Sequence, residues 1–344
     1  KRDTAVSYMT SYERYWIPLD IHNDKGEQLW FLLHPSLNMT GTSTLRWSSN
    51  NPNEQNISKQ EGFNLRYCFG PAKGREWWSL DAKNIELRIP AYESGEEELI
   101  SLFEQPDTPP YYGSTHLLNF HTVYPDIWEQ ELYEVGLEKV GPHCKKKYAS
   151  TWYQRCENGG FAVQYGAVER EAGTADKAFH RVGSHARLKE RFSNLEQLNS
   201  HWINFAEKHS YVETMPDKDV CPERGYPLLC TRSPWGGISP TIPLNYHVQG
   251  TAMWWMCRAM VRCQERLDQW RRENQFNAWI TMQVHDELVF DLPAGRGVRP
   301  WLTNLARVQQ LAGLMALGGD GIGVPTPVGI EYHSNNWSQG VTLQ

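Results

Sequence analysis

Two apolar segments that flank three polar residues constrain the fold of this chain more than any other feature. Residues 279–284 (WITMQV) and 288–290 (LVF) are rich in side chains that favour strands, and only residues 285–287 (HDE) separate them. This spacing predicts a β-hairpin. Such a hairpin would present the carboxylates of Asp286 and Glu287 at an exposed tip.

A further carboxylate follows another short apolar segment. Residues 77–80 (WWSL) predict a buried strand that ends at Asp81. If the strands are neighbours, Asp81 and Asp286 could hold two Mg²⁺ ions, which favour a few carboxylate oxygens together with substrate phosphates. That arrangement is typical of phosphoryl transfer. The pattern alone also allows both residues to be solvated acids at strand ends, because the chain contains 40 Asp and Glu residues.

Helical patterns account for much of the remaining chain. From Val248 to Trp270, apolar residues recur every three or four positions, as one buried helix face requires. Residues 125–206 are also predicted to be mostly helical. Residues 214–243 contain six Pro and three Gly, which predict a long irregular connection. Strands at both ends and helices between them indicate an α+β protein.

Composition narrows the functional classes. The net charge of -6 excludes a wholly basic nucleic-acid coat but not a local basic groove. The 15 Trp and 16 Tyr residues suit deep packing or stacking on bases. No run of about 18 apolar residues is present, so we expect no membrane partner. Seven Cys without a C-x-x-C pair, and no apolar signal segment, predict reduced thiols in the cytoplasm.

Five segments, in order, resemble motifs of the family A DNA polymerases, the DNA polymerase I group. Residues 79–88 resemble the first palm motif, D-x-S-x-x-E-L-R, with Lys83 at its Ser position, and residues 283–288 match the second palm motif, Q-V-H-D-E-[LI]. The other three are residues 46–57, similar to R-L-S-S-x-x-P-N-x-Q-N-I; residues 161–166, similar to [FY]-G-x-x-Y-G; and residues 245–252, similar to N-x-P-x-Q-G-T-A. Val324-Pro325 and Asn336-Trp337 near the C-terminus also fit.

The resemblance implies a right-hand polymerase fold with an antiparallel palm sheet and a mostly helical fingers subdomain. Residues 37–88 and 240–344 would form the palm, residues 89–239 the fingers, and residues 1–36 a thumb remnant or the entry to the palm. The thumb is expected to be largely absent, because only 45 residues precede Arg46. The chain would then be a fragment of a longer polymerase, or a separate thumb, exonuclease or processivity partner would complete it.

The resemblance also implies catalytic roles. Asp81 and Asp286 would hold two Mg²⁺ ions, with the backbone carbonyl of Ala82 near one of them, and Glu287 would be a secondary acid. The primer 3′-hydroxyl would attack the α-phosphate of a dNTP. Glu86 would sit beside the incoming sugar and exclude a 2′-hydroxyl, which implies deoxyribonucleotide substrates.

Further residues are implied to bind the dNTP and the DNA primer-template. Phe161 would pack on the sugar and Tyr165 would guard the insertion site. Residues 119–122 (NFHT) are similar to the family's D-[IL]-H-T, so His121 would contact the triphosphate. The residues implied to contact primer or template are Arg46, Gln55, Asn245, Gln249, His285 and Gly166.

The fingers helix departs from the family pattern R-x-x-x-K-x-x-x-[FY]. Tyr153 and Glu157 stand where the basic pair binds the triphosphate, and Glu157 has the wrong charge for that role. A helix irregularity at Gly159-Gly160 could let Arg155 or Lys147 replace the missing cation. Alternatively the polymerase is weak or inactive, or the lysine was altered. Two smaller departures are Thr241 in place of an Arg and His247 in place of a Pro.

Two alternatives to an active DNA polymerase remain. One is a catalytically weak or inactive polymerase-like module that binds primer-template, which Glu157 favours. The other is a relative of the single-subunit RNA polymerases, which Glu86 and the H-D-E form of the second palm motif oppose. The divergence of the motifs fits a phage or other mobile element, and therefore the cytoplasm of a bacterial or phage-infected host cell.

Overall fold

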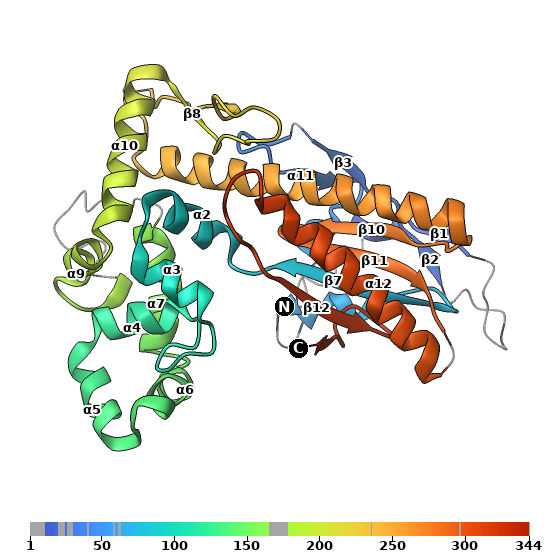
Figure 1. Ribbon diagram of the computed structural model, residues 1–344, viewed down its shortest axis with the longest axis horizontal. Helices are drawn as coiled ribbons and strands as arrows, with labels where there is room; N and C mark the ends of the chain where they lie inside the picture. Colours follow the sequence, from blue (N-terminus) through green and yellow to red (C-terminus); the bar gives the residue numbers. More distant parts are fainter. Residues whose placement is uncertain are drawn as a thin grey trace. The chain divides into compact units, whose positions relative to one another are not determined.

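The hairpin predicted from the sequence forms one edge of a five-stranded antiparallel sheet (Figure 1). Strand β7 is the middle strand and pairs with β11 on one side and with β12 on the other. The order is β10 (Trp279–Val284), β11 (Glu287–Pro293), β7 (Arg75–Ala82), β12 (Val328–His333) and β13 (Val341–Leu343). Both predicted strand regions are confirmed, although β7 begins before Trp77 and continues through Asp81 to Ala82.

The computed structural model describes residues 11–19, 25, 30–39, 41–57, 59–60, 63–164, 178–234, 236–295 and 297–343. The chain forms two compact units. Unit 1 comprises residues 1–83, 253–320 and 325–344, and unit 2 comprises residues 84–252 and 321–324. The chain therefore passes between the units just after β7 and again between residues 252 and 253, inside a long helix.

Strand β7 is buried on both faces. On one face, helix α12 (Val298–Ala316) covers it, and Asn304 of that helix donates a hydrogen bond of 2.7 Å to the buried carboxylate of Glu76. On the other face, Trp77 belongs to a core cluster with Met282 and Val289 of the neighbouring strands. A strand packed on both sides has little freedom to shift its register, so the position of its final carboxylate is well determined.

Short elements complete unit 1 within the described residues. None is longer than four residues. They are β1 (Ile17–Pro18) paired with β2 (Phe31–Leu32), β3 (Ser36–Asn38) paired with β4 (Ser48–Asn50), β5 (Lys59–Gln60) paired with β6 (Phe63–Asn64), and the 3₁₀ helices η1 (Glu54–Asn56), η2 (Leu65–Cys68) and η3 (Leu317–Gly319).

Unit 2 is mostly helical, as predicted for residues 125–206. Its helices in the described part of the chain are α2 (Ile85–Ser94), α3 (Glu97–Glu104), α4 (Thr115–Val123), α5 (Pro125–Val135), α6 (Leu137–Lys147), α7 (Trp152–Gln164), α9 (Ser184–Arg191) and α10 (Ser193–His209). Strands β8 (Tyr211–Glu213) and β9 (Pro227–Leu229) pair within the otherwise irregular connection that follows.

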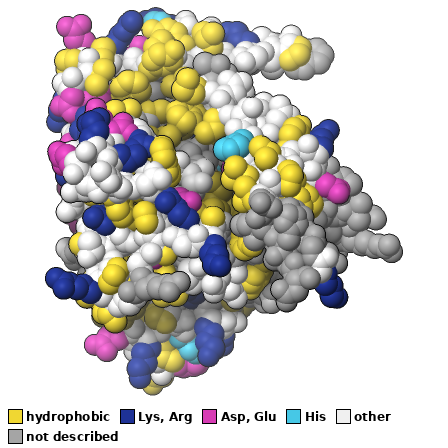
Figure 2. Space-filling view, turned by 90° about the vertical axis from the view of Figure 1, so that its right-hand side faces the viewer, with side chains coloured by type: hydrophobic (Ala, Val, Ile, Leu, Met, Phe, Trp, Pro, Cys, Tyr) yellow, Lys and Arg dark blue, Asp and Glu magenta, His cyan; other side chains and the backbone are white. Residues whose placement is uncertain are grey.

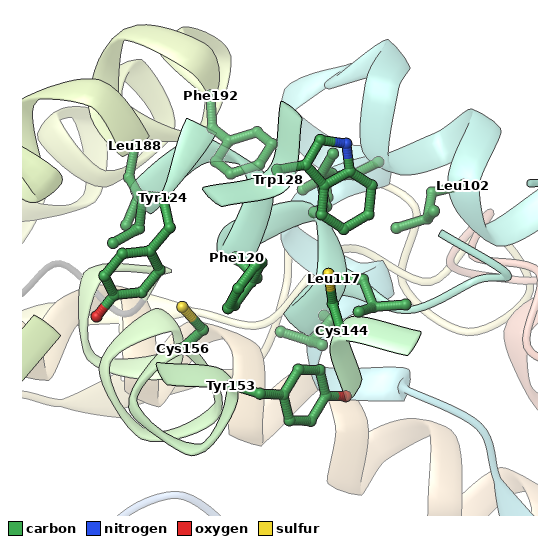
Figure 3. Close-up of a cluster of buried hydrophobic side chains, with 14 of the residues drawn as sticks. Leu102, Leu117, Phe120, Tyr124, Trp128, Cys144, Tyr153, Cys156, Leu188 and Phe192 are labelled. Atoms are coloured by element: carbon green, nitrogen blue, oxygen red, sulfur yellow. The ribbon is translucent and has the colours of Figure 1, made fainter. Parts of the chain in front are cut away.

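Helix α4 is central to the core of unit 2, because it contacts α5, α6, α7 and α9. Figure 3 shows the buried side chains of this cluster, with Phe120 of α4 between residues of several other helices. Ser114 caps the helix, since its side chain accepts a hydrogen bond from the backbone N–H of Leu117. The cap fixes where α4 begins and therefore which side chains face each neighbour.

Helix α11 (Thr241–Asn274) is the long helix predicted from the apolar periodicity, and it begins before Val248. Every residue of the predicted apolar face is buried: Val248, Ala252, Trp255, Ala259, Cys263, Leu267 and Trp270. The prediction of one continuous buried face is therefore confirmed. No helix in the described ranges is long and apolar enough to cross a membrane.

Helix α7 runs without interruption through Gly159 and Gly160, so the irregularity expected at these glycines is wrong. Close packing explains their presence. A Cβ atom on Gly159 would lie 2.6 Å from the ring of buried Phe179, and one on Gly160 would lie 2.2 Å from the side-chain amide of Asn119. The two glycines therefore allow α4 and Phe179 to approach the helix axis closely.

This packing predicts opposite effects for two glycine-to-alanine substitutions in helices. Gly159→Ala should destabilise the protein by about 1–3 kcal/mol, because the new methyl group meets the Phe179 ring. The matched control is Gly313→Ala in α12, where a Cβ has no neighbour within 4 Å. This change should stabilise the fold by up to about 1 kcal/mol through helix propensity. Urea denaturation measures the change in the free energy of unfolding for both variants. An increase in this free energy for Gly159→Ala would contradict the account.

Candidate active site

The pairing of β7 with β11 brings the predicted acidic residues together. Asp81 is opposite Glu287 in the register, and Asp286 lies in the two-residue turn just before β11. The backbone N–H of Ala82 donates a hydrogen bond of 3.0 Å to the carbonyl of Asp286, which ties the end of β7 to the hairpin tip. Sequence positions more than 200 residues apart therefore meet at one edge of the sheet.

These residues line a hollow of about 390 Å³ on unit 1. Its walls come from the hairpin tip, the end of β7, η1 and η2. The lining residues are Gln55, Asn56, Ile57, Arg66, Asp81, Val284, His285, Asp286 and Glu287. Of the residues predicted from the sequence, the structure thus gathers Asp81, Asp286, Glu287, His285 and Gln55 around one space.

Burial raises the pKa of Asp286, and the charges of Arg46 and His285 lower it in part. The pKa of His285 is lowered, first by desolvation and then by the charge of Arg46. The charge of Arg46 therefore acts on the acidic site itself. The sequence predicted only that Arg46 contacts primer or template. His285 has a positive φ of 54°, as the tight turn demands.

Glu287 is held by two side chains that the sequence analysis did not assign to the site. The indole N–H of Trp337 donates a hydrogen bond of 3.2 Å to it, and Arg66 lies 3.9 Å away. The guanidinium of Arg66 also stacks over the Trp337 ring, 3.7 Å from its centroid. Burial lowers the pKa of Arg66, while Glu287 opposes the shift. A single Arg inside the apolar segment 65–69 was the available sequence signal.

Gln55 fixes the hairpin tip through a chain of amide hydrogen bonds. Its carbonyl accepts from the backbone N–H of Ser49 at 3.1 Å, and its NH₂ donates to the side chain of Gln283 at 3.0 Å. Gln283 in turn donates to the backbone carbonyl of His285 at 2.6 Å. Both ends of the Gln55 amide are thus engaged within unit 1, which rigidifies the turn that carries Asp286.

The donor set fits a hard divalent cation. Asp81 and Asp286 offer carboxylates, and the carbonyl of Ala82 adds a backbone oxygen, which are the ligand types that Mg²⁺ prefers. In the described ranges, no group of three or more His, Cys, Asp or Glu side chains could hold a metal ion. Mg²⁺ commonly binds one or two carboxylates and completes its shell with water and phosphate. The raised pKa of Asp286 is consistent with a carboxylate whose charge a cation would compensate.

The remaining predicted site residues that the structure describes lie on unit 2. Glu86 occupies the first turn of α2, and Asn245 and Gln249 lie four residues apart on one face of α11, both half-buried. Phe161 is in the last turn of α7, and its side chain lies outside the described part of the structure. Tyr165 and Gly166 lie entirely outside the described residues.

His121 is half-buried in an aromatic environment. Its Nδ1 atom is 2.5 Å from the Tyr111 hydroxyl, and its ring stacks on Trp128 with 4.9 Å between centroids. Desolvation, followed by the charge of Arg191, lowers its pKa to about 4, with Glu98 opposing the shift. His121 is therefore neutral at pH 7.

Another histidine of α4 faces the helix that carries the family's triphosphate-binding positions. The His116 ring meets Tyr153 of α7 edge-on, with 6.3 Å between centroids. Burial lowers the pKa of His116, and the charge of Glu157 partly offsets this. Residues 114–117 (STHL) share only the histidine with D-[IL]-H-T, and the N-cap Ser114 stands where that motif has its Asp. The sequence analysis did not consider this histidine.

The two cations expected to replace the missing lysine already have partners. Lys147 forms ion pairs of 2.7 and 2.9 Å with the buried carboxylate of Glu131. Burial raises the pKa of the Tyr124 hydroxyl, and the charge of Arg155 lowers it in part, so Arg155 lies beside this tyrosine. Both arginine and lysine therefore stabilise the helical packing of unit 2.

His247, which replaces a family proline, is completely buried and connects several elements of unit 2. Its Nδ1 atom is 2.5 Å from the backbone carbonyl of Glu213, and its Nε2 atom is 2.5 Å from the carboxylate of Glu93. The ring also stacks on Trp202 with 4.3 Å between centroids. The departure at this position is therefore accompanied by a local hydrogen-bond network.

The comparisons with known proteins agree with the geometry of the site. The family model described as DNA polymerase family A matches residues 27–300. This chain belongs to DNA polymerase family A. It is 26% identical over 268 residues to DNA polymerase I of Caldicellulosiruptor bescii, covering 76% of this chain and 28% of that protein. It is 28% identical over 291 residues to the thermostable DNA polymerase I of Thermus thermophilus, covering 82% of this chain and 30% of that protein.

A solved structure shows the same fold. It is the POL domain of Pol1 from M. smegmatis in complex with DNA primer-template and dNTP, with a TM-score of 0.64 and 20% identity. The match covers 98% of this chain and 52% of that chain. This chain thus spans less than a third of the length of the two curated relatives described above.

The burial of His121 predicts a histidine that titrates far below the usual range. NMR of labelled histidine should show its pKa near 4. In the unfolded state the pKa of this histidine is about 6.5. Between pH 6.5 and pH 4 the unfolded state therefore binds more protons than the folded state. The contribution of His121 to the free energy of unfolding is accordingly lost as the pH falls through this interval. In His121→Gln, the free energy of unfolding should change less steeply in this interval, by up to about 1.4 kcal/mol per pH unit. A titration near pH 6.5 would contradict the packing described.

Proposed function

We propose that the chain is a template-directed DNA polymerase that adds dNTPs to a primer 3′-hydroxyl. One observation carries the proposal: Asp81 and Asp286 lie at adjacent ends of paired strands in a chain of family A. The solved relative, which is bound to primer-template and dNTP, supports these as the partners. Residues 37–88 and 240–344 would act as the palm and residues 89–239 as the fingers.

The acidic site would work by holding its ligands in a fixed geometry. Asp81, the carbonyl of Ala82 and Asp286 would bind two Mg²⁺ ions. When bound, these ions would supply activation of the attacking hydroxyl and stabilisation of the leaving pyrophosphate. The hydrogen bond from Ala82 to Asp286 and the amide chain from Gln55 hold the carboxylates in place before substrate arrives. Such preorganisation avoids reorganisation at the moment of reaction.

Substrate selection would depend on unit 2. Glu86, in the first turn of α2, would exclude a 2′-hydroxyl, and Phe161 and Tyr165 would contact the sugar and the insertion site. We assign the triphosphate contact to His116 in preference to His121, because His116 faces Tyr153 and the Glu157 charge. The DNA contacts would come from Arg46, Asn245, Gln249, His285 and Gly166, with Gln55 acting chiefly to position the hairpin tip.

Other segments or proteins would complete the enzyme. The relatives are more than three times as long as the matched region, so a thumb, an exonuclease or a processivity partner would be supplied by the rest of a longer chain or by another protein. We place the activity in the cytoplasm.

A catalytically weak or inactive primer-template-binding module is the second candidate. The observation that favours it is the negative charge of Glu157 at the position of the family lysine. Of the expected replacements, Lys147 is engaged by the Glu131 carboxylate, and Arg155 lies beside the Tyr124 hydroxyl. Primer extension separates the two candidates, because only the first requires incorporation of nucleotides.

The proposed metal site predicts a large loss of activity from an isosteric change. Asp286→Asn should reduce the rate of primer extension with Mg²⁺ by at least about 1,000-fold, or roughly 4 kcal/mol in the barrier, because it removes a charged ligand. The affinity for primer-template should change by less than about threefold. Asp320→Asn, an exposed acid of the same unit, is the matched control and should leave both unchanged. Normal extension by Asp286→Asn would refute the metal assignment.

Reversing the charge at position 157 tests the fingers. Glu157→Lys should lower the KM for dNTP by about tenfold or more, because a lysine would form a charge-assisted contact with the triphosphate. Glu157→Gln, which removes the negative charge without adding a positive one, should have a smaller effect in the same direction. An unchanged KM in both variants would mean that this face of α7 does not meet the triphosphate. Extension by Glu157→Lys but not by the unaltered chain would identify Glu157 as the cause of inactivity.

A further inference from the structure

A second hollow of about 390 Å³ lies on unit 1 beside the acidic site. Its walls are mostly aromatic and aliphatic, and they come from a helical turn at residues 11–13, the paired strands β1 and β2, η2, β7 and β10. The aromatic residues among them are Tyr12, Trp16, Trp30, Phe31, Phe69 and Trp77. The size is that of a small-molecule site and much greater than the space of one water molecule.

Among the described residues that line this hollow, one side chain is charged, that of Glu54. Glu54 is only 8% exposed, and within the described part of the chain its carboxylate forms no hydrogen bond or ion pair. Its backbone is fixed, because its N–H donates to the Ser49 hydroxyl at 3.1 Å. An ionised carboxylate in such surroundings is costly unless a partner compensates its charge.

The pKa of Glu54 is that of a buried carboxylate without a nearby positive charge. Burial raises its pKa to about 7, and no neighbouring charge contributes to the shift. The other titratable side chains that line the hollow are Tyr12 and Cys68, and the Tyr12 hydroxyl already donates to the carbonyl of Asn53. A ligand that brings a positive charge would therefore meet no competing cation from the walls.

The aromatic walls suit the same kind of ligand. The faces of Trp, Tyr and Phe rings attract cations, and an apolar wall accommodates an alkyl chain. Trp16 and Phe31 pack with 4.7 Å between ring centroids, and Trp30, Phe31 and Leu32 are partly exposed at the edge of the unit. Figure 2 shows hydrophobic side chains, in yellow, exposed in clusters on the side of the molecule at which β1 and β2 lie in Figure 1. The hollow therefore has an apolar approach to a buried carboxylate.

We propose that this hollow binds an alkylammonium ion, with the ammonium group on the Glu54 carboxylate and the alkyl chain against Trp16, Trp30 and Trp77. The ligand would be a free amine or the side chain of a lysine, which present the same chemistry. Helix η1 separates the two hollows, because Glu54 faces this one while Gln55 and Asn56 line the acidic one. The proposal is independent of polymerase activity and is tested by binding.

Binding of n-butylammonium chloride, followed by the indole N–H resonances of the three tryptophans in NMR spectra, tests the site directly. We expect saturable shifts of these resonances in the millimolar range. 1-Butanol, which has the same chain without the charge, should bind at least about tenfold more weakly, because charge-assisted hydrogen bonds contribute such a factor. Equal binding of the alcohol would overturn the proposal, as would the absence of binding by the ammonium ion.

The pH dependence gives a test that needs no variant. The ammonium ion stays charged up to about pH 10. Its affinity should therefore rise between pH 6 and pH 8 as Glu54 loses its proton, whereas the affinity for 1-butanol should stay constant. A flat profile for the ammonium ion would show that Glu54 is not its partner.

Variants provide the matched comparison. Glu54→Gln should weaken butylammonium binding at least about tenfold and abolish its pH dependence. Glu13→Gln, an exposed acid one residue from Tyr12, should leave both unchanged. The raised pKa of Glu54 makes the folded protein lose stability as the pH rises from about 4.5 to 7. Glu54→Gln should therefore be more stable than the unaltered chain at pH 8. A stable variant that no longer binds would show that the loss of binding does not come from unfolding.

Three further ligands identify the source of the ammonium group and test the main competing ligand. Tighter binding of 1,4-diaminobutane than of N-acetyl-lysine methylamide would indicate a free amine, and the reverse order a lysine side chain. Deoxyguanosine is the competitor, because aromatic walls with one carboxylate could also hold a planar base. Shifts of the same indoles by deoxyguanosine but not by butylammonium would overturn the proposal.

Discussion

The pairing of β7 with β11 is the interaction on which the proposed chemistry depends. Strand β7 is packed on both faces, by α12 on one side and by the cluster around Trp77 on the other. A shift of one residue would move its alternate side chains to the wrong face. The register that this packing enforces is also what puts Asp81 opposite Glu287 and beside Asp286. The stability of the sheet and the geometry of the acidic site are therefore consequences of the same contacts.

Local periodicity explains what could be predicted from the sequence. The hairpin around residues 285–287 and the buried face of α11 both follow from spacings of two or of three and four residues, and both are confirmed. Features that depend on contacts distant in sequence were not predictable in this way. Gly159 and Gly160 looked like a helix defect, whereas they allow the approach of Phe179 and Asn119. Arg66 could be placed at the site only once Trp337 and Glu287 were known to be its neighbours.

Helix α4 carries both histidines that we consider for the proposed triphosphate contact. A motif match alone selects His121, yet capping by Ser114 places His116 on the side that faces α7 and leaves His121 against Trp128. The same helix interface contains the departure at Glu157, whose charge acts on His116. Asp81, Asp286 and Glu287 match the acidic positions of the family motifs, whereas Tyr153 and Glu157 on α7 replace the basic pair. A change in how substrate is bound, with the carboxylate chemistry preserved, would produce this distribution.

The most direct test of the central claim is to locate the metal. Crystals of the chain soaked with Mn²⁺, which takes similar oxygen ligands and scatters anomalously, would show where a divalent cation binds. The account predicts an anomalous peak about 2.0–2.3 Å from carboxylate oxygens of both Asp81 and Asp286, at the end of β7. A peak that contacts only one of these residues, or one that lies on Glu287 away from both, would contradict the shared site.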